Sequence, residues 1–290
     1  MSILVNRQTR VMVQGITGRA GRTQTRWMLD YGTNIVAGVT PGKSGEVVEG
    51  VPVYDTVAEA VQKQQVEASV FFVPPPAIKQ AAFDNIDAGV KLIVVVTEHV
   101  PIQDVMEIRE HVNGRPIQVI GPTSPGIITP GEAKIGILPA NMFSPGRIGV
   151  ISRSGTLSYE VSINLAKGGY GQSTVVGIGA DPVVFTNMPE ILRLFEKDPG
   201  TDAVVIVGEV GGIQEEKAAE YIDRWMTKPV VAYIAGINAP AEKRMGHAGA
   251  IIQGDGKGTP QSKIAALREV GVDIAEHPSQ VVELIRKHLG

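Results

Sequence analysis

Short runs of apolar residues recur along the chain, and most are followed by a turn with Gly or Pro and then by a helical pattern. In the first half these runs span residues 10–14, 34–39, 68–73, 92–97 and 118–120. Continuous runs rich in Val and Ile are typical of parallel strands that are covered on both faces. Because predicted strands alternate with predicted helices, the sequence predicts a doubly wound α/β fold.

This alternation is interrupted once, by a segment rich in Pro and Gly near residues 122–146. After it, further strands are predicted at 148–152, 174–178, 203–207 and 230–235, and amphipathic helices at 261–270 and 280–288. A segment of that composition is typical of a connector. We therefore expect two α/β domains in tandem, at residues 1–125 and 147–290, with a connector at 126–146.

The composition narrows the functions that such a fold can have. The chain has 290 residues, a net charge of −3 and no basic tract with interleaved aromatic residues, so neither nucleic acid nor a membrane is an expected partner. Cysteine is absent, which excludes disulfides and thiolate chemistry, and the five histidines are not spaced like metal ligands. No signal or transit peptide is recognisable, so a cytoplasmic location is expected, with the mitochondrial matrix as the alternative for a eukaryotic source.

Glycines spaced G-x-x-G-x-x-G at residues 15–21 follow the first predicted strand and begin a helix. At this place in a doubly wound sheet, glycines let the backbone approach a phosphate, and the helix N-terminus supplies free amides. The alternative is a tight turn that holds no ligand. The second strand is followed by Lys43 instead of the acidic residue that binds the ribose of NAD, which argues against an NAD-dependent oxidoreductase. Glu98 and His99 follow the fourth strand, where they either line the same site or cap a helix.

Three features of the second half together are typical of a phosphohistidine site. Ser154, Gly155 and Thr156 follow a strand and begin a helix, so they form either an anion site or an ordinary cap. Glu209 follows another strand and precedes two glycines, so its carboxylate either orients an imidazole or is a solvated turn acid. His247 lies among small residues, which suits a nucleophile that two partners must reach in turn, although a surface histidine is the alternative.

Taken in order, these motifs resemble the α subunit of succinyl-CoA synthetase (succinate–CoA ligase), and the resemblance runs from end to end of the chain. The matching segments are 15–18, 38–43, 97–98, 121–122, 152–156, 177–179 with 181–182, 208–212 and 243–250. The last of them, K-R-M-G-H-A-G-A, is highly specific. The resemblance implies an N-terminal Rossmann-like CoA-binding domain followed by a flavodoxin-like parallel-sheet domain that carries the phosphohistidine.

The resemblance also implies a role for each site residue. His247 would be the phosphorylated histidine, and Glu209 would hold its ring. Residues 154–156 would hold the phosphate, and Tyr159 would lie near the carboxylic acid and the subunit contact. The residues that would bind coenzyme A are Thr17, Gly18, Arg19, Ala20, Lys43, Val96, Thr97 and Glu98.

The implied activity is the reversible conversion of succinate, coenzyme A and ATP or GTP to succinyl-CoA, ADP or GDP and phosphate through phosphohistidine. In this family the nucleotide, with Mg²⁺, is bound by a separate β subunit that has an ATP-grasp domain, in an αβ heterodimer or an α2β2 heterotetramer. The sequence agrees with this, since it has neither a Walker A motif nor a kinase signature.

The chain departs from the family at several positions near the expected acyl and phosphate sites. They are Thr23 and Gln24 (commonly Phe and His), Thr123 and Ser124 (usually Asn, then Cys or Thr), Ala180 (usually Gly), and Val184 and Phe185 (usually small and polar). Two alternatives therefore stay open. One is an ADP-forming ligase for another acid, such as malate or acetate, and the other is a non-catalytic subunit that binds coenzyme A.

Overall fold

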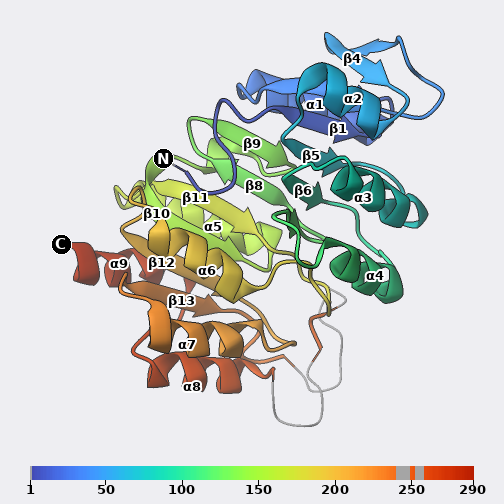
Figure 1. The fold of residues 1–290 in the computed structure, drawn as a ribbon. Helices are drawn as coiled ribbons and strands as arrows, with labels where there is room; N and C mark the ends of the chain where they lie inside the picture. Colours follow the sequence, from blue (N-terminus) through green and yellow to red (C-terminus); the bar gives the residue numbers. More distant parts are fainter. Residues whose placement is uncertain (1, 240–248, 252–257) are drawn as a thin grey trace.

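The computed structural model describes residues 2–239, 249–251 and 258–290, which form two sheets flanked by helices (Figure 1). His247, the predicted nucleophile, lies outside the described residues. In the described part of the chain, no helix is long and apolar enough to cross a membrane.

The first sheet has the strand order β3-β4-β2-β1-β5-β6-β7. Its strands are β1 (Val11–Gln14), β2 (Ile35–Val39), β3 (Val47–Val48), β4 (Val51–Tyr54), β5 (Ala68–Phe71), β6 (Leu92–Val95) and β7 (Gln118–Ile120). All neighbours are parallel except β3 and β4. Without the short strand β3 this is the Rossmann order, which reverses between β1 and β5, so the predicted fold of the N-terminal domain is confirmed.

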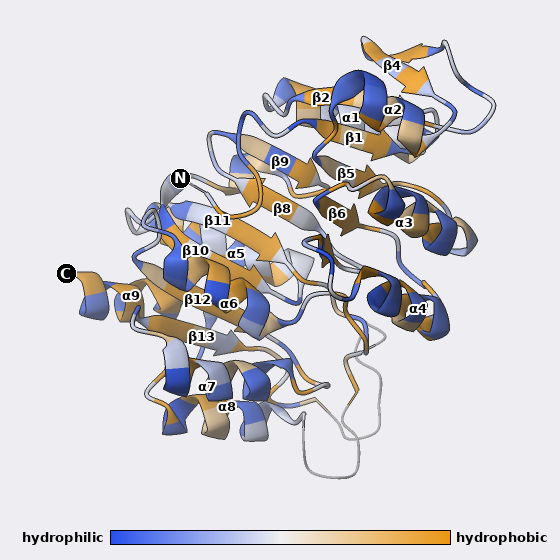
Figure 2. Ribbon diagram, in the orientation of Figure 1, coloured by the Kyte–Doolittle hydropathy of each residue, from blue (hydrophilic) through white to orange (hydrophobic). Residues whose placement is uncertain are grey.

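Helices cover both faces of the first sheet, which explains why its strands are apolar at most positions on both faces. The helices are α1 (Arg19–Asp30), α2 (Val57–Gln64), α3 (Ile78–Asp87) and α4 (Ile102–Val112), with a 3-10 turn η1 (Pro75–Ala77). Side chains alternate across a strand, so Val11 and Val13 pack into one core and Met12 packs into another. Figure 2 shows the result as apolar strands and helices whose outer faces are hydrophilic.

The second sheet has the strand order β14-β13-β12-β10-β11-β8-β9. Its strands are β8 (Gly126–Thr129), β9 (Ala133–Gly136), β10 (Pro145–Ser152), β11 (Gln172–Gly177), β12 (Ala203–Gly208), β13 (Val230–Ile234) and β14 (Asp273–Ala275). The five strands from β10 to β14 are parallel and follow the flavodoxin order, as predicted. Its helices are α5 (Gly155–Lys167), α6 (Met188–Lys197), α7 (Gln214–Trp225), α8 (Pro260–Glu269) and α9 (Val281–Leu289), with 3-10 turns η2 (Ala140–Met142) and η3 (Pro278–Gln280).

The segment 126–146, expected as a connector, contains a hairpin that the sequence did not predict. Strand β8 pairs with β11 in antiparallel fashion and β9 pairs with β8, so the hairpin extends the second sheet. Gly126 and Gly136 lie opposite each other in this hairpin, and a Cβ at Gly126 would lie 2.0 Å from the Ile135 carbonyl oxygen. The glycines thus permit close strand pairing here, whereas in the sequence they suggested a loop. The division into residues 1–125, 126–146 and 147–290 stays a prediction.

The two sheets are joined by side chains as well as by the chain itself. Phe185, after β11, is buried in the core of the first sheet, and its amide donates to the Gly121 carbonyl over 2.8 Å. The Thr186 hydroxyl donates to the Val119 carbonyl over 2.5 Å. The domains therefore share a packed boundary near the carboxyl ends of β7 and β11.

Candidate functional site

Two of the predicted site residues follow neighbouring strands of the second sheet. Strands β10 and β12 are parallel, with Ser152 opposite Val207, and the Arg153 amide donates to the Val207 carbonyl over 3.1 Å. The strand order reverses between β10 and β12, which is where open α/β sheets bind ligands at their carboxyl edge. Ser154 and Glu209 come directly after these two strand ends, so the fold brings them together.

The start of α5 is built to hold an anion. Ser154 is its N-cap, and the Ser154 hydroxyl accepts a hydrogen bond of 3.4 Å from the Leu157 amide. Ser152 fixes the preceding turn, since its hydroxyl accepts from the Ser154 amide over 3.1 Å. The first turn of α5 has no acidic residue, and Thr156 is exposed. The remaining free amides and the positive end of the helix dipole therefore favour a phosphate at this point.

Glu209 begins a tightly packed loop. Its Oε1 lies 3.8 Å from Nη2 of Arg153, and both side chains are buried. Gly211 has a φ of 85°, and a Cβ there would lie 2.0 Å from the Gly249 carbonyl oxygen. The Gly211 amide donates to the Gly258 carbonyl over 2.8 Å. Gly249, the first described residue after His247, thus packs against the loop that carries Glu209.

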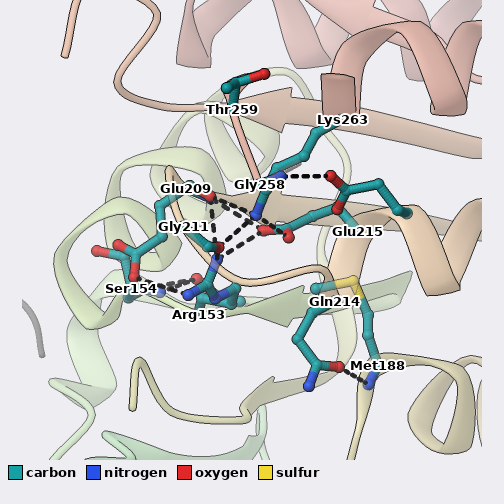
Figure 3. A network of polar contacts seen from close by, with 12 residues as sticks. Arg153, Ser154, Met188, Glu209, Gly211, Gln214, Glu215, Gly258, Thr259 and Lys263 are labelled. Atoms are coloured by element: carbon teal, nitrogen blue, oxygen red, sulfur yellow. Dashed lines mark hydrogen bonds and ion pairs between the residues drawn. The ribbon is translucent and has the colours of Figure 1, made fainter. Parts of the chain in front are cut away.

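Behind this loop lies a network of buried charges that the sequence analysis missed (Figure 3). Lys263 on α8 forms an ion pair with Glu215 on α7, and Glu215 also pairs with Arg153 at 3.3 Å. Burial alone would raise the pKa of Glu215, but the charges of Arg153 and Lys263 outweigh burial and lower that pKa. Burial also lowers the pKa of Lys263, and the Glu215 carboxylate offsets this only in part.

No sequence signal indicated that these three residues form a buried charge network. Arg153 lies inside the S-R-S-G-T motif, but Glu215 and Lys263 are ordinary helix residues in the sequence. Arg153 also lines a cavity of about 510 Å³. The other described residues that line this cavity are Arg109, Asp181, Pro182, Val183, Val184, Gly212, Ile213, Gln214, Lys217, Gly249, Ile251 and Gly258.

Tyr159 lies one turn into α5, near the proposed phosphate. A Cβ added at Gly155 would lie 3.3 Å from the Tyr159 hydroxyl, so this hydroxyl faces the start of the helix. The ring packs edge-to-face against Phe143, with centroids 6.1 Å apart. Burial raises the pKa of Tyr159, so the phenol is neutral and can donate a hydrogen bond near neutral pH.

In the first sheet, the glycine loop forms the turn before α1. Gly18 is the N-cap and has no side-chain cap, and the first turn contains no acidic residue. Arg19 and Ala20 are exposed in that turn, although cations are disfavoured at a helix N-terminus. An anion at the free amides would relieve this repulsion, so the turn fits a phosphate group. In the described part of the chain, no group of three His, Asp or Glu residues could hold a metal ion.

The other residues predicted to bind coenzyme A lie at the same edge of the first sheet. The Thr17 hydroxyl donates to the Thr40 hydroxyl over 3.2 Å, which joins the glycine loop to the end of β2. Lys43, just beyond, is exposed and pairs with Glu46 at 2.9 Å. Thr97 follows β6, and its hydroxyl donates to the Val73 carbonyl over 2.9 Å. Strand β5 separates β1 from β6, so the predicted residues form two groups along one edge. The second group comprises Val96, Thr97 and the exposed Glu98.

Comparisons with known proteins identify the family of the chain. A family model described as a CoA binding domain matches residues 6–99, and one described as CoA-ligase matches residues 151–273. The α subunit of ADP-forming succinate–CoA ligase from Aquifex aeolicus is 50% identical over 291 residues, covering 100% of this chain and 95% of that protein. Subunit alpha 2 from Archaeoglobus fulgidus is 53% identical over 289 residues and covers 100% of both chains. The chain belongs to the family of succinate–CoA ligase α subunits.

Solved structures share the fold of this α-subunit family at lower identity. An ATP citrate lyase from Methanothrix soehngenii, in complex with citrate and coenzyme A, superposes with a TM-score of 0.87 at 24% identity. The likeness covers 98% of this chain and 50% of that longer one. A dinucleotide-forming acetyl-coenzyme A synthetase from Ca. Korarchaeum cryptofilum gives a TM-score of 0.74 at 21% identity, covering 95% of this chain and 60% of that one.

Several of the positions expected to depart from the family pattern form hydrogen bonds here, whereas the buried Oε1 of Gln24 has no hydrogen-bond partner among the described residues. The Thr123 hydroxyl donates to Asp181 over 3.0 Å, and the Ser124 hydroxyl donates to the Gly177 carbonyl over 2.5 Å. The Ala180 carbonyl accepts from the Gly249 amide over 3.0 Å. In α1 the Thr23 hydroxyl donates to the Arg19 carbonyl over 3.0 Å. The bonds of Thr123, Ser124 and Ala180 join the turns around the site, whereas the bond of Thr23 lies within α1.

Proposed function

We propose that this chain is the α subunit of a nucleotide-dependent succinate–CoA ligase that works through phosphohistidine at His247. One observation carries the proposal. The uncharged start of α5 at Ser154, the buried Glu209, and Gly249, two residues after His247, meet at the reversal point of the second sheet. A phosphohistidine needs amides around the phosphoryl oxygens and a carboxylate that orients the ring, and these residues supply both.

In this proposal each residue at the second sheet has a defined task. Glu209 accepts a hydrogen bond from one imidazole nitrogen of His247 and so makes the other nitrogen the nucleophile. The amides and hydroxyls at residues 154–156 bind the phosphoryl oxygens when the group is on His247. Tyr159, with a neutral phenol, donates to the carboxylic acid near the subunit contact.

Coenzyme A is proposed to bind at the first sheet. The uncapped start of α1 takes a phosphate group of the coenzyme, and Lys43 adds a cation beyond β2. The full proposed set is Thr17, Gly18, Arg19, Ala20, Lys43, Val96, Thr97 and Glu98. The nucleotide and its Mg²⁺ are assigned to a β partner, in an αβ or α2β2 assembly, and the cytoplasm is the proposed location.

The proposed reaction consists of two phosphoryl transfers, followed by displacement of phosphate by coenzyme A. The imidazole nitrogen of His247 forms a bond to the terminal phosphorus of the nucleotide as the bond to the nucleoside diphosphate breaks. An oxygen of the acid's carboxylate then takes the phosphoryl group, which restores the imidazole. The coenzyme A sulfur then forms a bond to the carboxyl carbon as the bond from this carbon to the bridging oxygen breaks. Phosphate leaves with that oxygen, and the thiol proton is released. The chain's own residues orient the imidazole and stabilise the phosphoryl charge throughout.

The test is phosphoryl transfer in the complex with the β partner. With labelled ATP, the wild-type chain is expected to take up alkali-stable, acid-labile label, and succinate plus coenzyme A should discharge it. His247→Ala should take up no label and lose ligase activity while keeping its fold by circular dichroism. The matched control is His277→Ala, which changes an exposed histidine of the same domain and should label normally. Label or turnover retained by His247→Ala contradicts the proposal.

The chase also separates the two alternatives. Label that forms but is discharged only by malate, acetate or another acid keeps the mechanism and changes the substrate. A chain that binds coenzyme A and never labels with any partner is a non-catalytic subunit.

A further inference from the structure

Three charged side chains lie fully out of solvent behind Glu209. Arg153 is 3% exposed, and Glu215 and Lys263 are both 0% exposed. They come from three elements: the turn after β10, the first turn of α7, and α8. The mechanism proposed above gives none of them a chemical task.

These side chains bind the backbone of the loop that carries Glu209 (Figure 3). Nζ of Lys263 donates to the carbonyl oxygens of Glu209 and Gly211 over 2.8 and 2.7 Å. Nη1 of Arg153 donates to the same two carbonyls over 3.0 and 2.5 Å. The Glu209 amide donates to Oε1 of Glu215 over 3.1 Å. Three backbone groups of residues 209–211 are therefore fixed by three charges.

Stability alone does not explain this arrangement. Removing charges from water is unfavourable, and apolar residues of the same volume often stabilise a protein as well or better. The contacts fix a backbone position, because the two cations share the carbonyls of Glu209 and Gly211, and the Glu215 carboxylate accepts from the Glu209 amide that precedes them. A small displacement of this loop would move the Glu209 carboxylate relative to Ser154.

Lys263 also joins this loop to the element that follows residues 252–257. Helix α8 begins at Pro260, capped by the Thr259 hydroxyl, which accepts from the Ser262 amide over 2.9 Å. Just before it, Gly258 accepts a hydrogen bond from the Gly211 amide over 2.8 Å. A Cβ at Gly258 would lie 2.7 Å from the Gly212 carbonyl oxygen. The loop after β12 and the start of α8 thus occupy fixed positions relative to each other, with Lys263 as the buried link.

We propose that Lys263 is a positioning residue, which with Arg153 and Glu215 fixes the backbone at 209–211 so that the Glu209 carboxylate is aimed at the phosphoryl-accepting imidazole. This inference rests on the proposed function, because it gives Lys263 its effect through Glu209. It predicts that Lys263 affects phosphoryl transfer to His247 and leaves coenzyme A binding at the first sheet unchanged.

The experiment measures the rate of His247 phosphorylation in single turnover, in the complex with the β partner. Lys263→Met keeps the length of the side chain and removes its charge. We expect this rate to fall by about 10- to 100-fold, as for the loss of other groups that orient a reacting side chain. The KM for coenzyme A should change by less than about twofold, since the first sheet is not altered.

The deciding measurement repeats the substitution with Glu209 disabled. If Lys263 acts through Glu209, then Lys263→Met should slow labelling by less than about twofold in a Glu209→Gln background, because coupled residues are not additive. A merely structural role would slow both backgrounds equally, and that result would overturn the proposal. Unchanged labelling in the single variant would overturn it as well.

A matched control comes from Lys228, which also donates to two carbonyls. Its Nζ lies 2.6 Å from the Phe195 carbonyl oxygen and 2.5 Å from the Asp198 carbonyl oxygen. Lys228 precedes the N-terminal end of β13, whereas the site lies at the carboxyl ends of the strands. Lys228→Met should label at the wild-type rate.

If Lys263→Met fails to fold, Lys263→Gln replaces it, because its amide keeps a hydrogen-bond donor. Its labelling rate is then measured in the wild-type and Glu209→Gln backgrounds. Absence of label on the wild-type chain would instead count against the proposed function, so the two failures are distinct.

Discussion

At the scale of single residues, two buried lysines show how the surroundings of an ammonium group determine its effect on stability. Lys263 is enclosed by a carboxylate and two carbonyls, whereas Lys134 on β9 is 2% exposed and forms no ion pair with the described residues. Its ammonium lies 5.9 Å from the ring centroid of Trp27. Burial lowers the pKa of Lys134, so the charged form is less stable there than in water. Lys134 therefore costs stability that the neighbouring ring offsets only in part.

This cost gives a stability prediction. Lys134→Met keeps the aliphatic stem and removes the ammonium, so we expect the free energy of unfolding to rise by about 1 kcal/mol at neutral pH. Chemical denaturation of the two chains measures the difference. Lys91→Met, at an exposed lysine, is the control and should change stability by less than about 0.5 kcal/mol. A clear loss of stability in Lys134→Met would show that the ammonium is satisfied.

The same residue predicts a dependence on pH. Between the lowered pKa of folded Lys134 and its usual value of 10.5, the unfolded chain binds more protons than the folded chain. The stability of the wild type should therefore rise with pH in that window, relative to Lys134→Met. The advantage of the variant should be largest at neutral pH and should shrink toward pH 10.5, as measured by denaturation in buffers of increasing pH. A constant difference between the two chains would contradict this account.

At the scale of elements, α1 shows how backbone packing sets the proposed coenzyme site. A Cβ at Gly21 would lie 2.2 Å from the Gly15 carbonyl oxygen, and one at Gly38 would lie 2.3 Å from the Ile16 side chain. The helix thus sits directly on the turn that precedes it, and glycine is required for contact as well as for turning the chain. This close approach leaves the amides of the first turn open at the edge of the sheet.

Gly21→Ala should push α1 away from this turn. We expect a loss of stability of about 1–3 kcal/mol from overpacking, and weaker coenzyme A binding by about tenfold because the amides move. Denaturation and isothermal titration calorimetry with coenzyme A measure the two effects. Arg26→Ala, on the exposed face of the same helix, should change neither by a comparable amount. Normal coenzyme A affinity in Gly21→Ala would show that this turn does not contribute to the coenzyme A site.

At the scale of the whole molecule, the packed boundary makes the two sheets one structure. Phe185 belongs by sequence to the second domain and is 8% exposed inside the core of the first. The adjacent hydrogen bonds of Phe185 and Thr186 reach Gly121, directly after β7, and Val119, within β7. This boundary fixes how the edge proposed for coenzyme A faces the edge proposed for the phosphohistidine.

Removal of the Phe185 ring should weaken this boundary. Phe185→Ala is expected to lower the free energy of unfolding by about 3–5 kcal/mol, and to separate calorimetric unfolding into two transitions. Trp225→Ala is the control, because that aromatic side chain is 66% exposed and should contribute little. A single transition at the wild-type temperature in Phe185→Ala would contradict the proposed coupling.

The sequence by itself determined the α/β architecture, its interruption between two halves of the chain, and which residues stand at strand ends. Those features follow from periodicity and turn chemistry within a few neighbouring residues, as at Gly15, Ser154 and Glu209. The short strands β3, β4, β8, β9 and β14 were not predicted, because each is short and is a strand only through its pairing with another strand.

Only the tertiary structure decided what surrounds the site. Glu215 pairs with Arg153 across 62 positions of sequence and with Lys263 across 48, and no local pattern marks either partner. Burial, and with it the energetic weight of each charge, depends on the packing of α7 and α8 against the sheet. The physical reason is that hydrophobic periodicity depends on residues that are neighbours in sequence. The pairing of charges in a core depends on residues that are neighbours in space.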